Sequence, residues 1–260
     1  MLEKKGKIIA VANQKGGVGK TTTAINLATA MAAIGKKILL IDLDPQGNAS
    51  TGLGVSRAER DVTIYDVLIN DREVTDATFK SAIPCLDLIP STVDLSGADL
   101  ELNDMARRSF RLRDSLEKSD ILNVYEFIFI DCPPSLSLLT LNAFVAADSV
   151  LVPLQCEFFA LEGLSLLMKT IDMVKKNQNE RLSMEGVVLT MFDRRNNLSE
   201  QVDSDVRAYL GDKVFETVIP RNVRLSEAPS HGLPALMYDL NCAGSQAYIS
   251  LATELLRRNA

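Results

Sequence analysis

A glycine-rich loop between a short apolar run and a helical pattern constrains this chain more than any other feature. Residues 13–23 read NQKGGVGKTTT. The preceding run KIIAVA, at residues 7–12, is typical of a buried strand, and residues 21–34 have the apolar spacing of a helix that Gly35 would cap. Strand, loop and helix in this order form a phosphate cradle, because successive backbone N–H groups converge on an anion at the helix N-terminus. The feature predicts an α/β fold that binds a nucleotide.

The residues of this loop have separate expected roles. The glycines let the backbone approach phosphate oxygens. Lys20 can reach the β- and γ-phosphates, and the Thr21 hydroxyl can ligate magnesium. The expected nucleotide contacts are consecutive: Lys15, Gly16, Gly17, Val18, Gly19, Lys20, Thr21 and Thr22.

Apolar runs alternate with helical patterns along the rest of the chain. Further strands are expected at residues 37–42, 86–89, 127–131, 149–152, 186–190 and 214–219. Helices are expected near residues 95–105, 110–117, 138–146, 161–176, 200–210 and 246–258. Strands that are apolar on both faces and alternate with helices indicate a mostly parallel sheet with helices on both faces. With no repeat and no linker, residues 1–260 are expected to form a single P-loop NTPase domain.

Composition limits the partners and the compartment. The net charge of −6 gives no overall attraction to nucleic acid or anionic lipid, so such binding needs a local basic patch. No run of 18 apolar residues suggests a membrane span, and the start MLEKKGKIIAVANQ lacks a signal peptide, so a cytoplasmic protein is expected. The four cysteines, Cys85, Cys132, Cys156 and Cys242, form no CxxC pair and are expected to be buried, reduced thiols.

Carboxylates follow two of the expected strands. Asp131 ends the run FIFID, at the edge where α/β sheets bind ligands, and is expected to hold magnesium through water. Asp42 and Asp44 lie in IDLDPQGN. Their spacing does not decide which one takes part in hydrolysis, because Asp44 lies just beyond the strand and before a proline.

The loop also departs from the common pattern GxxxxGK[ST]. Gln14 occupies the position of the first glycine, and Lys15 follows it. Together with IDLDPQGNAST, IDCPPS, VPLQCEFFALEG and VIPRNVRLSEAPSHG, the sequence KGGVGKT resembles the chromosomal ParA (Soj) type of the ParA/MinD family of ATPases with a deviant Walker A motif. The resemblance extends over nearly the whole chain.

The resemblance implies roles for individual residues. Lys15 would cross a dimer interface to the nucleotide of the partner, and Asp44 would position the attacking water and approach the magnesium ion. Pro220 would pack on the adenine ring, while Asn222 would offer a donor and an acceptor to its edge. The DNA contacts would be Arg195 and Arg224, whose forked donors suit phosphate oxygens.

The resemblance also implies a cycle. ATP with Mg²⁺ would join two protomers face to face, and the homodimer would bind double-stranded DNA without sequence preference. A ParB-type centromere-binding protein would stimulate a slow intrinsic hydrolysis and release the dimer. The protein would then act in chromosome or plasmid partition, in the cytoplasm and on the nucleoid, without a membrane.

Three other classes share parts of this sequence pattern. A MinD-like membrane-cycling ATPase needs an additional C-terminal amphipathic helix, which is not expected because the sequence ends LLRRNA. A reductase or metal-handling relative needs paired cysteines at the interface. A ParA-like ATPase that positions another cellular cargo would have the same nucleotide motifs, so sequence separates it poorly.

Overall fold

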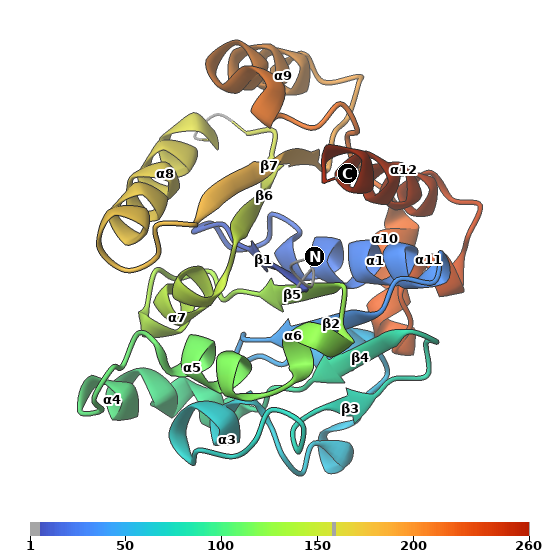
Figure 1. Ribbon diagram of the computed structural model, residues 1–260. Helices are drawn as coiled ribbons and strands as arrows, with labels where there is room; N and C mark the ends of the chain where they lie inside the picture. The colour runs from blue at the N-terminus through green and yellow to red at the C-terminus, as the bar shows by residue number, and fades with distance from the viewer. Residues whose placement is uncertain (1–5, 158–159, 260) are drawn as a thin grey trace.

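A seven-stranded sheet forms the centre of the molecule, in a computed structural model that describes residues 6–157 and 160–259 (Figure 1). Phe158 and Phe159, part of the segment VPLQCEFFALEG, lie outside the described residues. The strand order is β3-β4-β2-β5-β1-β6-β7, with β3 antiparallel to β4 and every other pair parallel. The mostly parallel sheet predicted from the sequence is therefore confirmed.

The strands are β1 (Lys7–Val11), β2 (Ile38–Asp42), β3 (Phe79–Lys80), β4 (Leu86–Ile89), β5 (Phe127–Asp131), β6 (Ser149–Gln155) and β7 (Ser183–Thr190). The α-helices are α1 (Lys20–Ala33), α2 (Asn48–Gly52), α3 (Ile64–Ile69), α4 (Ala98–Asn103), α5 (Arg111–Lys118), α6 (Ile121–Val124), α7 (Leu138–Ala146), α8 (Ala160–Asn177), α9 (Asn197–Leu210), α10 (Val223–Glu227), α11 (Ala235–Tyr238) and α12 (Ala243–Arg258). Short 3₁₀ turns are η1 (Arg57–Glu59), η2 (Val93–Gly97), η3 (Gly211–Lys213) and η4 (Ala228–His231).

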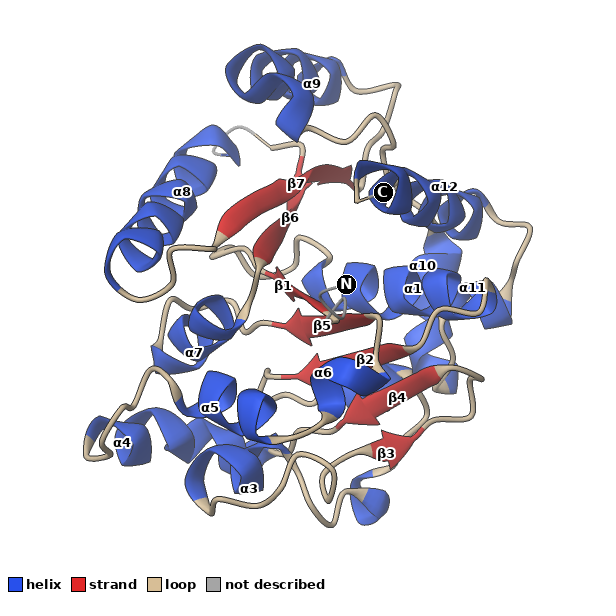
Figure 2. Ribbon diagram, in the orientation of Figure 1, coloured by secondary structure: helices blue, strands red, loops and turns tan. Residues whose placement is uncertain are grey.

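Two layers of helices cover the sheet. In Figure 2, α1, α10, α11 and α12 lie to the right of the strands, and α7 and α8 lie to the left. Successive side chains of a strand point to opposite faces, so Ile8 and Ala10 join one apolar cluster while Ile9 and Val11 join the other. The prediction of helices on both faces is confirmed, and the chain forms a single α/β domain.

The predicted strand at residues 214–219 is wrong. Only isolated bridges occur there, at Val214 and Pro220. The Glu254 carboxylate of α12 accepts the N–H groups of Glu216 and Thr217, each at 2.9 Å. A carboxylate on a different element therefore replaces the strand partner that these N–H groups would otherwise need.

Three other expectations need correction. β6 continues through Pro153 to Gln155; β1 pairs with it only as far as Leu151, so the proline lies beyond the part of β6 that is bonded on both sides. The helix expected near residues 95–105 is divided into η2 and α4. Of the four free cysteines, only Cys132 and Cys156 are buried, whereas Cys85 is exposed and Cys242 is half-buried.

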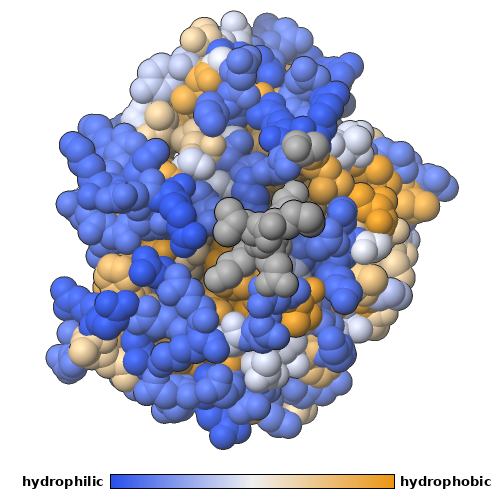
Figure 3. All heavy atoms as spheres, viewed as in Figure 1, coloured by the Kyte–Doolittle hydropathy of each residue, from blue (hydrophilic) through white to orange (hydrophobic). Residues whose placement is uncertain are grey.

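The outer surface is largely hydrophilic on the face shown in Figure 3. Apolar side chains gather toward its right-hand edge. Met237 of α11 and Leu240, just after that helix, are exposed. In the described part of the chain, no helix is both long and apolar enough to span a bilayer.

Candidate functional site

The register of three central strands brings the predicted site residues to one edge of the sheet. β5 lies between β2 and β1, and Asp131 pairs with Asp42 on one side and with Val11 on the other. The glycine-rich loop begins just beyond Val11 and leads into α1. The acidic strand ends and the phosphate loop are therefore neighbours, because parallel strands end at a common edge.

The loop has the backbone that a phosphate cradle requires. Gly17 and Gly19 have φ angles of 77° and 88°, in the left-handed region that favours glycine. A side chain at Gly16 or Gly17 would meet no atom within 4 Å, so there is open space beside this backbone. Lys20 is 7% exposed, and its Nζ donates to the carbonyl of Lys15 at 3.0 Å, which curls the loop around the ammonium group. Burial lowers the pKa of Lys20, and the charge of Asp131 opposes this effect.

Asp131 is completely buried, and neither carboxylate oxygen has a hydrogen bond of normal geometry. Burial raises its pKa well above the usual range, Asp42 adds to the rise, and the Thr21 side chain acts in the opposite direction. Buried polar atoms without partners are rare and point to a missing water or ion. A magnesium ion with its water shell fits this carboxylate, with the Thr21 hydroxyl as a further oxygen donor. No group of three or more His, Cys, Asp or Glu side chains suited to a metal occurs among residues 6–157 and 160–259.

The structure gives different surroundings to the two carboxylates that residue spacing alone left undecided. Asp42 is fully buried, and one of its oxygens accepts both the N–H and the hydroxyl of Ser50 at 2.7 Å. Asp42 therefore anchors α2. Asp44 is 9% exposed and accepts the N–H of Gln46 at 2.9 Å, within the turn that leads to α2. The side chain of Asp44 thus has the greater freedom to face a ligand.

Lys15 lies at the outside of the loop. Its side chain is half exposed, and its ammonium group forms an ion pair with Glu157, just after β6. The Lys15 N–H donates to the side chain of Asn13 at 3.0 Å, and Asn13 in turn donates to the carbonyl of Pro153 at 2.7 Å. In the single protomer, Lys15 is thus held against the β6 end.

The loops after β7 and before α10 meet beside the phosphate loop. The N–H of Phe192 donates to Ile219 at 3.0 Å, and the N–H of Arg221 donates to Phe192 at 3.1 Å. Thr190, at the end of β7, donates its hydroxyl to the carbonyl of Val18 at 2.8 Å. The two loops are therefore fixed to each other and to the phosphate loop.

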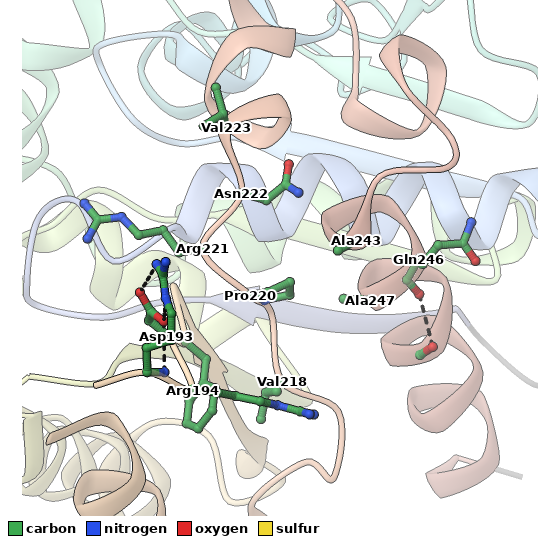
Figure 4. Close-up of a pocket in the computed structure, with 13 residues that line it drawn as sticks. Asp193, Arg194, Val218, Pro220, Arg221, Asn222, Val223, Ala243, Gln246 and Ala247 are labelled. Atoms are coloured by element: carbon green, nitrogen blue, oxygen red, sulfur yellow. Dashed lines mark hydrogen bonds and ion pairs between the residues drawn. The ribbon is translucent and has the colours of Figure 1, made fainter. Parts of the chain in front are cut away.

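These loops and α12 line an open pocket of about 750 Å³. In Figure 4, Pro220 and Asn222 point toward α12, whereas Arg221 points the opposite way. The side-chain oxygen of Asn222 accepts the N–H of Arg224 at 2.9 Å and caps α10, so its amide N–H₂ remains for a ligand. The two residues predicted for adenine thus line the same pocket, to which residues 13–23 of the phosphate loop do not contribute.

Both predicted DNA-binding arginines have carboxylate partners within the protein. The Arg195 guanidinium donates to both oxygens of Asp193, at 2.9 and 2.8 Å, and this pairing lowers the pKa of Asp193 to about 2. Arg224 pairs with Glu227 at 2.8 Å and with Asp239 at 3.4 Å. All of these side chains lie at the surface, where ion pairs contribute little and exchange readily. DNA phosphate would compete with these carboxylates.

Sequence reasoning missed several residues that shape the site. Thr190 supports the loop, Ser50 holds Asp42, and Arg60 is buried beside α2. Isolated serine, threonine and arginine residues carry no motif. Arg60 can be recognised only by its contact with Gly47, and this contact exists only in the folded chain.

Known proteins resemble this chain over nearly its whole length. A family described as an AAA domain matches residues 6–184, which is more than half of the chain. The chromosome partitioning protein ParA of Caulobacter vibrioides is 62% identical over 97% of this chain and 94% of its own. The sporulation initiation inhibitor protein Soj of Bacillus subtilis is 52% identical over 96% of this chain and 98% of its own.

A solved structure gives the same fold. The cobyrinic acid a,c-diamide synthase from Mycobacterium smegmatis, with a bound ATP analog and magnesium, superimposes with a TM-score of 0.83. It is 36% identical and covers 97% of this chain and 95% of its own. The fold described above is thus one that binds nucleotide and magnesium in that protein.

Proposed function

Since this chain belongs to the ParA/Soj family of chromosome-partitioning ATPases, we propose that it hydrolyses ATP with Mg²⁺ to control binding to DNA. The observation that carries this proposal is the carboxylate of Asp131. It is buried, neither of its oxygens has a hydrogen bond of normal geometry, and it lies in register between Asp42 and the strand that leads into the phosphate loop. Such a carboxylate suits the water shell of magnesium on a nucleotide.

The phosphate loop binds the nucleotide in this proposal. Residues 15–22 surround the phosphates, with Lys20 at the β- and γ-phosphates and Thr21 on the magnesium ion. Pro220 and Asn222 hold the adenine in the pocket beside α12. The hydrogen bond from Thr190 to Val18 ties the end of β7, close to one side of this pocket in the chain, to the phosphate loop. Magnesium would neutralise phosphate charge, and the residues of the chain would hold the nucleotide in position.

Asp44 positions the attacking water and lies close to the magnesium site. Its place on a turn outside the sheet, with Asp42 committed to Ser50, supports this choice. Phosphoryl transfer gains most from positioning and charge neutralisation, so a displaced Asp44 slows the reaction without removing the nucleotide.

Lys15 makes assembly depend on ATP. We propose that it leaves Glu157 and contacts the nucleotide of a second protomer, so that two chains enclose two nucleotides. The exposed pair with Glu157 costs little to break, because surface ion pairs contribute at most about 1 kcal/mol. The place of this lysine on the outer side of the loop supports homodimerisation.

The ATP-bound dimer binds double-stranded DNA through Arg195 and Arg224, without sequence preference. A ParB-type protein stimulates the slow hydrolysis and releases the dimer, in the cytoplasm and on the nucleoid. The names of the relatives support partition as the process. Lys175 and Lys176, at the end of α8, lie at the opposite edge of the sheet from Arg195, because α8 runs back between the parallel strands β6 and β7.

Replacing Asp44 tests the hydrolytic part of the proposal. Asp44→Ala is expected to bind Mg-ATP with nearly the original affinity and to lose turnover by about 100-fold or more, because only positioning of the water is lost. Phosphate release and equilibrium binding of a fluorescent ATP analogue measure the two effects. Asp94→Ala, on the exposed turn η2, is the matched control and keeps both. Normal turnover by Asp44→Ala would contradict the assignment.

A further inference from the structure

Arg60 is buried between the segment that carries Asp44 and the end of β4. Arg60 is the residue directly after the turn η1, and it is 7% exposed. Its hydrogen bonds go to neutral oxygen atoms rather than to a carboxylate. Burying a charge costs free energy unless its donors are hydrogen-bonded, so a buried guanidinium at this position indicates a specific role.

The guanidinium joins three separate points of the chain. One terminal nitrogen, Nη1, donates to the carbonyl of Ser91 at 2.9 Å, just after β4. The other, Nη2, donates to the hydroxyl of Thr51 in α2 and to the carbonyl of Val55, each at 2.8 Å. Arginine can do this because its donors have a fixed, planar arrangement.

A line of hydrogen bonds runs from this guanidinium to Asp44. The Thr51 hydroxyl accepts from Arg60, which leaves its own hydrogen to donate to the carbonyl of Gly47 at 3.0 Å. The Thr51 N–H donates to the same carbonyl, also at 3.0 Å. The N–H of Gly47 donates to the carbonyl of Asp44 at 2.9 Å. Arg60, Thr51 and Gly47 thus fasten the turn that presents Asp44.

Direct packing strengthens this line. Gly47 has a φ of 63°, and a Cβ there would lie 2.4 Å from Nη1 of Arg60 and 2.9 Å from the carbonyl oxygen of Ser91. The guanidinium therefore lies against the bare backbone of Gly47. Ser91 also donates its N–H to Ser50 at 3.1 Å, and Ser50 binds Asp42. Arg60 completes a ring of contacts around residues 42–51.

We propose that Arg60 is a positioning residue for ATP hydrolysis, which holds Asp44 in place through Thr51 and Gly47. This inference rests on the proposed function of Asp44. The line from Arg60 leads to the Asp44 turn, whereas the phosphate loop has its own supports in Thr190 and Asn13. Loss of the guanidinium should therefore lower the rate of hydrolysis and leave ATP affinity nearly unchanged.

Single-turnover hydrolysis of Mg-ATP and equilibrium binding of ATP test the proposal, both below the melting temperature of each variant. Arg60→Met is expected to slow hydrolysis about 10- to 100-fold, with ATP affinity changed less than about threefold. The hydrolysis rate of Arg60→Lys is expected to lie between those of Arg60→Met and the original protein, because an ammonium group reaches fewer of the three points. Arg57→Met, an exposed arginine on η1 with the same change of charge, is the matched control and keeps both values.

Thr51→Val gives a second test with little risk to folding, because Thr51 is exposed. It removes the hydroxyl that links Arg60 to Gly47, so it should slow hydrolysis, and the double variant with Arg60→Met should be no slower than Arg60→Met alone. Additive losses in the double variant would contradict the relay.

Three results overturn the role of Arg60: normal hydrolysis by Arg60→Met, a parallel loss of ATP affinity, or an equal loss in Arg57→Met. Asp44→Ala, measured in the same assays, distinguishes a failure of the proposed role of Arg60 from a failure of the proposed role of Asp44. If Asp44→Ala is inactive while Arg60→Met is fully active, only the role of Arg60 fails. If Asp44→Ala hydrolyses ATP normally, the role of Asp44 fails and that of Arg60 fails with it.

Discussion

At the residue scale, burial decides which polar groups serve a ligand. Asp131 and Lys20 lie deep at the end of the central strands, where an uncompensated charge is expensive. Asp42 is equally buried, but Ser50 satisfies it. The contrast supports Asp131, whose oxygens have no hydrogen bond of normal geometry, as the carboxylate that would face the water shell of a magnesium ion.

Replacing Lys20 tests the loop at this scale. Lys20→Ala removes the buried ammonium group from the phosphate cradle and is expected to weaken ATP binding by at least about 100-fold, since charge-assisted bonds to phosphate are strong. Titration with a fluorescent ATP analogue measures the loss. Lys36→Ala, beyond the far end of α1 and exposed in its pair with Glu126, is the control that keeps binding. Tight ATP retention by Lys20→Ala would remove the loop assignment.

At the element scale, the segment before α10 depends on α12 for its shape. Glu254 of α12 is 4% exposed and binds the N–H groups of Glu216 and Thr217, with Arg258 as its ion-pair partner at 2.7 Å. Burial by itself would raise the pKa of Glu254, but the hydrogen bonds from Thr217, Glu216 and Arg258 outweigh it and lower the pKa. The ionised carboxylate is therefore the form that the fold requires.

Glu254→Gln should reveal this requirement through its pH dependence. At neutral pH the variant is expected to lose about 1–3 kcal/mol of unfolding free energy, because an amide offers one acceptor where the carboxylate offers two. A lowered pKa means that the stabilisation is present above the ordinary glutamate pKa and is lost as pH falls through the native value. Urea unfolding at pH 7 and at acidic pH should thus show a difference in unfolding free energy between the variant and the original protein that becomes smaller on acidification. An equal difference at both pH values would contradict the assignment.

Most elements could be predicted from local pattern, and the exceptions have long-range causes. The strands at 37–42 and 127–131 match closely because each contains four consecutive apolar residues, ILLI and FIFI. The strand at 86–89 matches as well, although Asp87 interrupts its apolar residues. The 214–219 segment has strand-like residues, but a carboxylate 37 or 38 residues away takes its N–H groups. The short elements α2, α3, α6, α10 and α11 are stabilised by packing, which leaves little periodicity in four to six residues.

The site was predictable where a motif fixes the spacing. The phosphate loop, Asp131 and the Asp42–Asp44 pair lie together as the strand order requires. Residue spacing left Asp42 and Asp44 undecided, and the resemblance pointed to Asp44. The contact between Asp42 and Ser50, eight residues away, follows from no sequence pattern. Arg60 belongs to no motif, and its contacts with Thr51 and Ser91 form only when β4 and α2 are packed together.

At the scale of the whole molecule, an acidic chain must concentrate its positive charge to hold DNA. The net charge is −6, so binding through Arg195 and Arg224 has to arise from a local patch and from two copies of it in the dimer. To bind phosphate, Arg195 would first have to leave Asp193, and Arg224 would have to leave Glu227 and Asp239. The affinity should therefore be modest for one protomer and higher for two.

The salt dependence of DNA binding measures this patch. A dimer with two arginines per protomer neutralises about four phosphates, which predicts a slope of log affinity against log salt of roughly −4. Arg195→Glu should lose DNA and keep ATP-dependent dimerisation, and Arg181→Glu, at the opposite edge of the sheet, is the control that keeps both. A slope near zero, or unchanged affinity in Arg195→Glu, would rule out these contacts.

The central claim is that ATP, through Lys15, joins two protomers. Size-exclusion chromatography of Asp44→Ala in saturating Mg-ATP and in Mg-ADP tests it most directly, because this variant keeps the bound ATP intact. We predict a dimer with ATP and a monomer with ADP. A monomer in both nucleotides would contradict the claim.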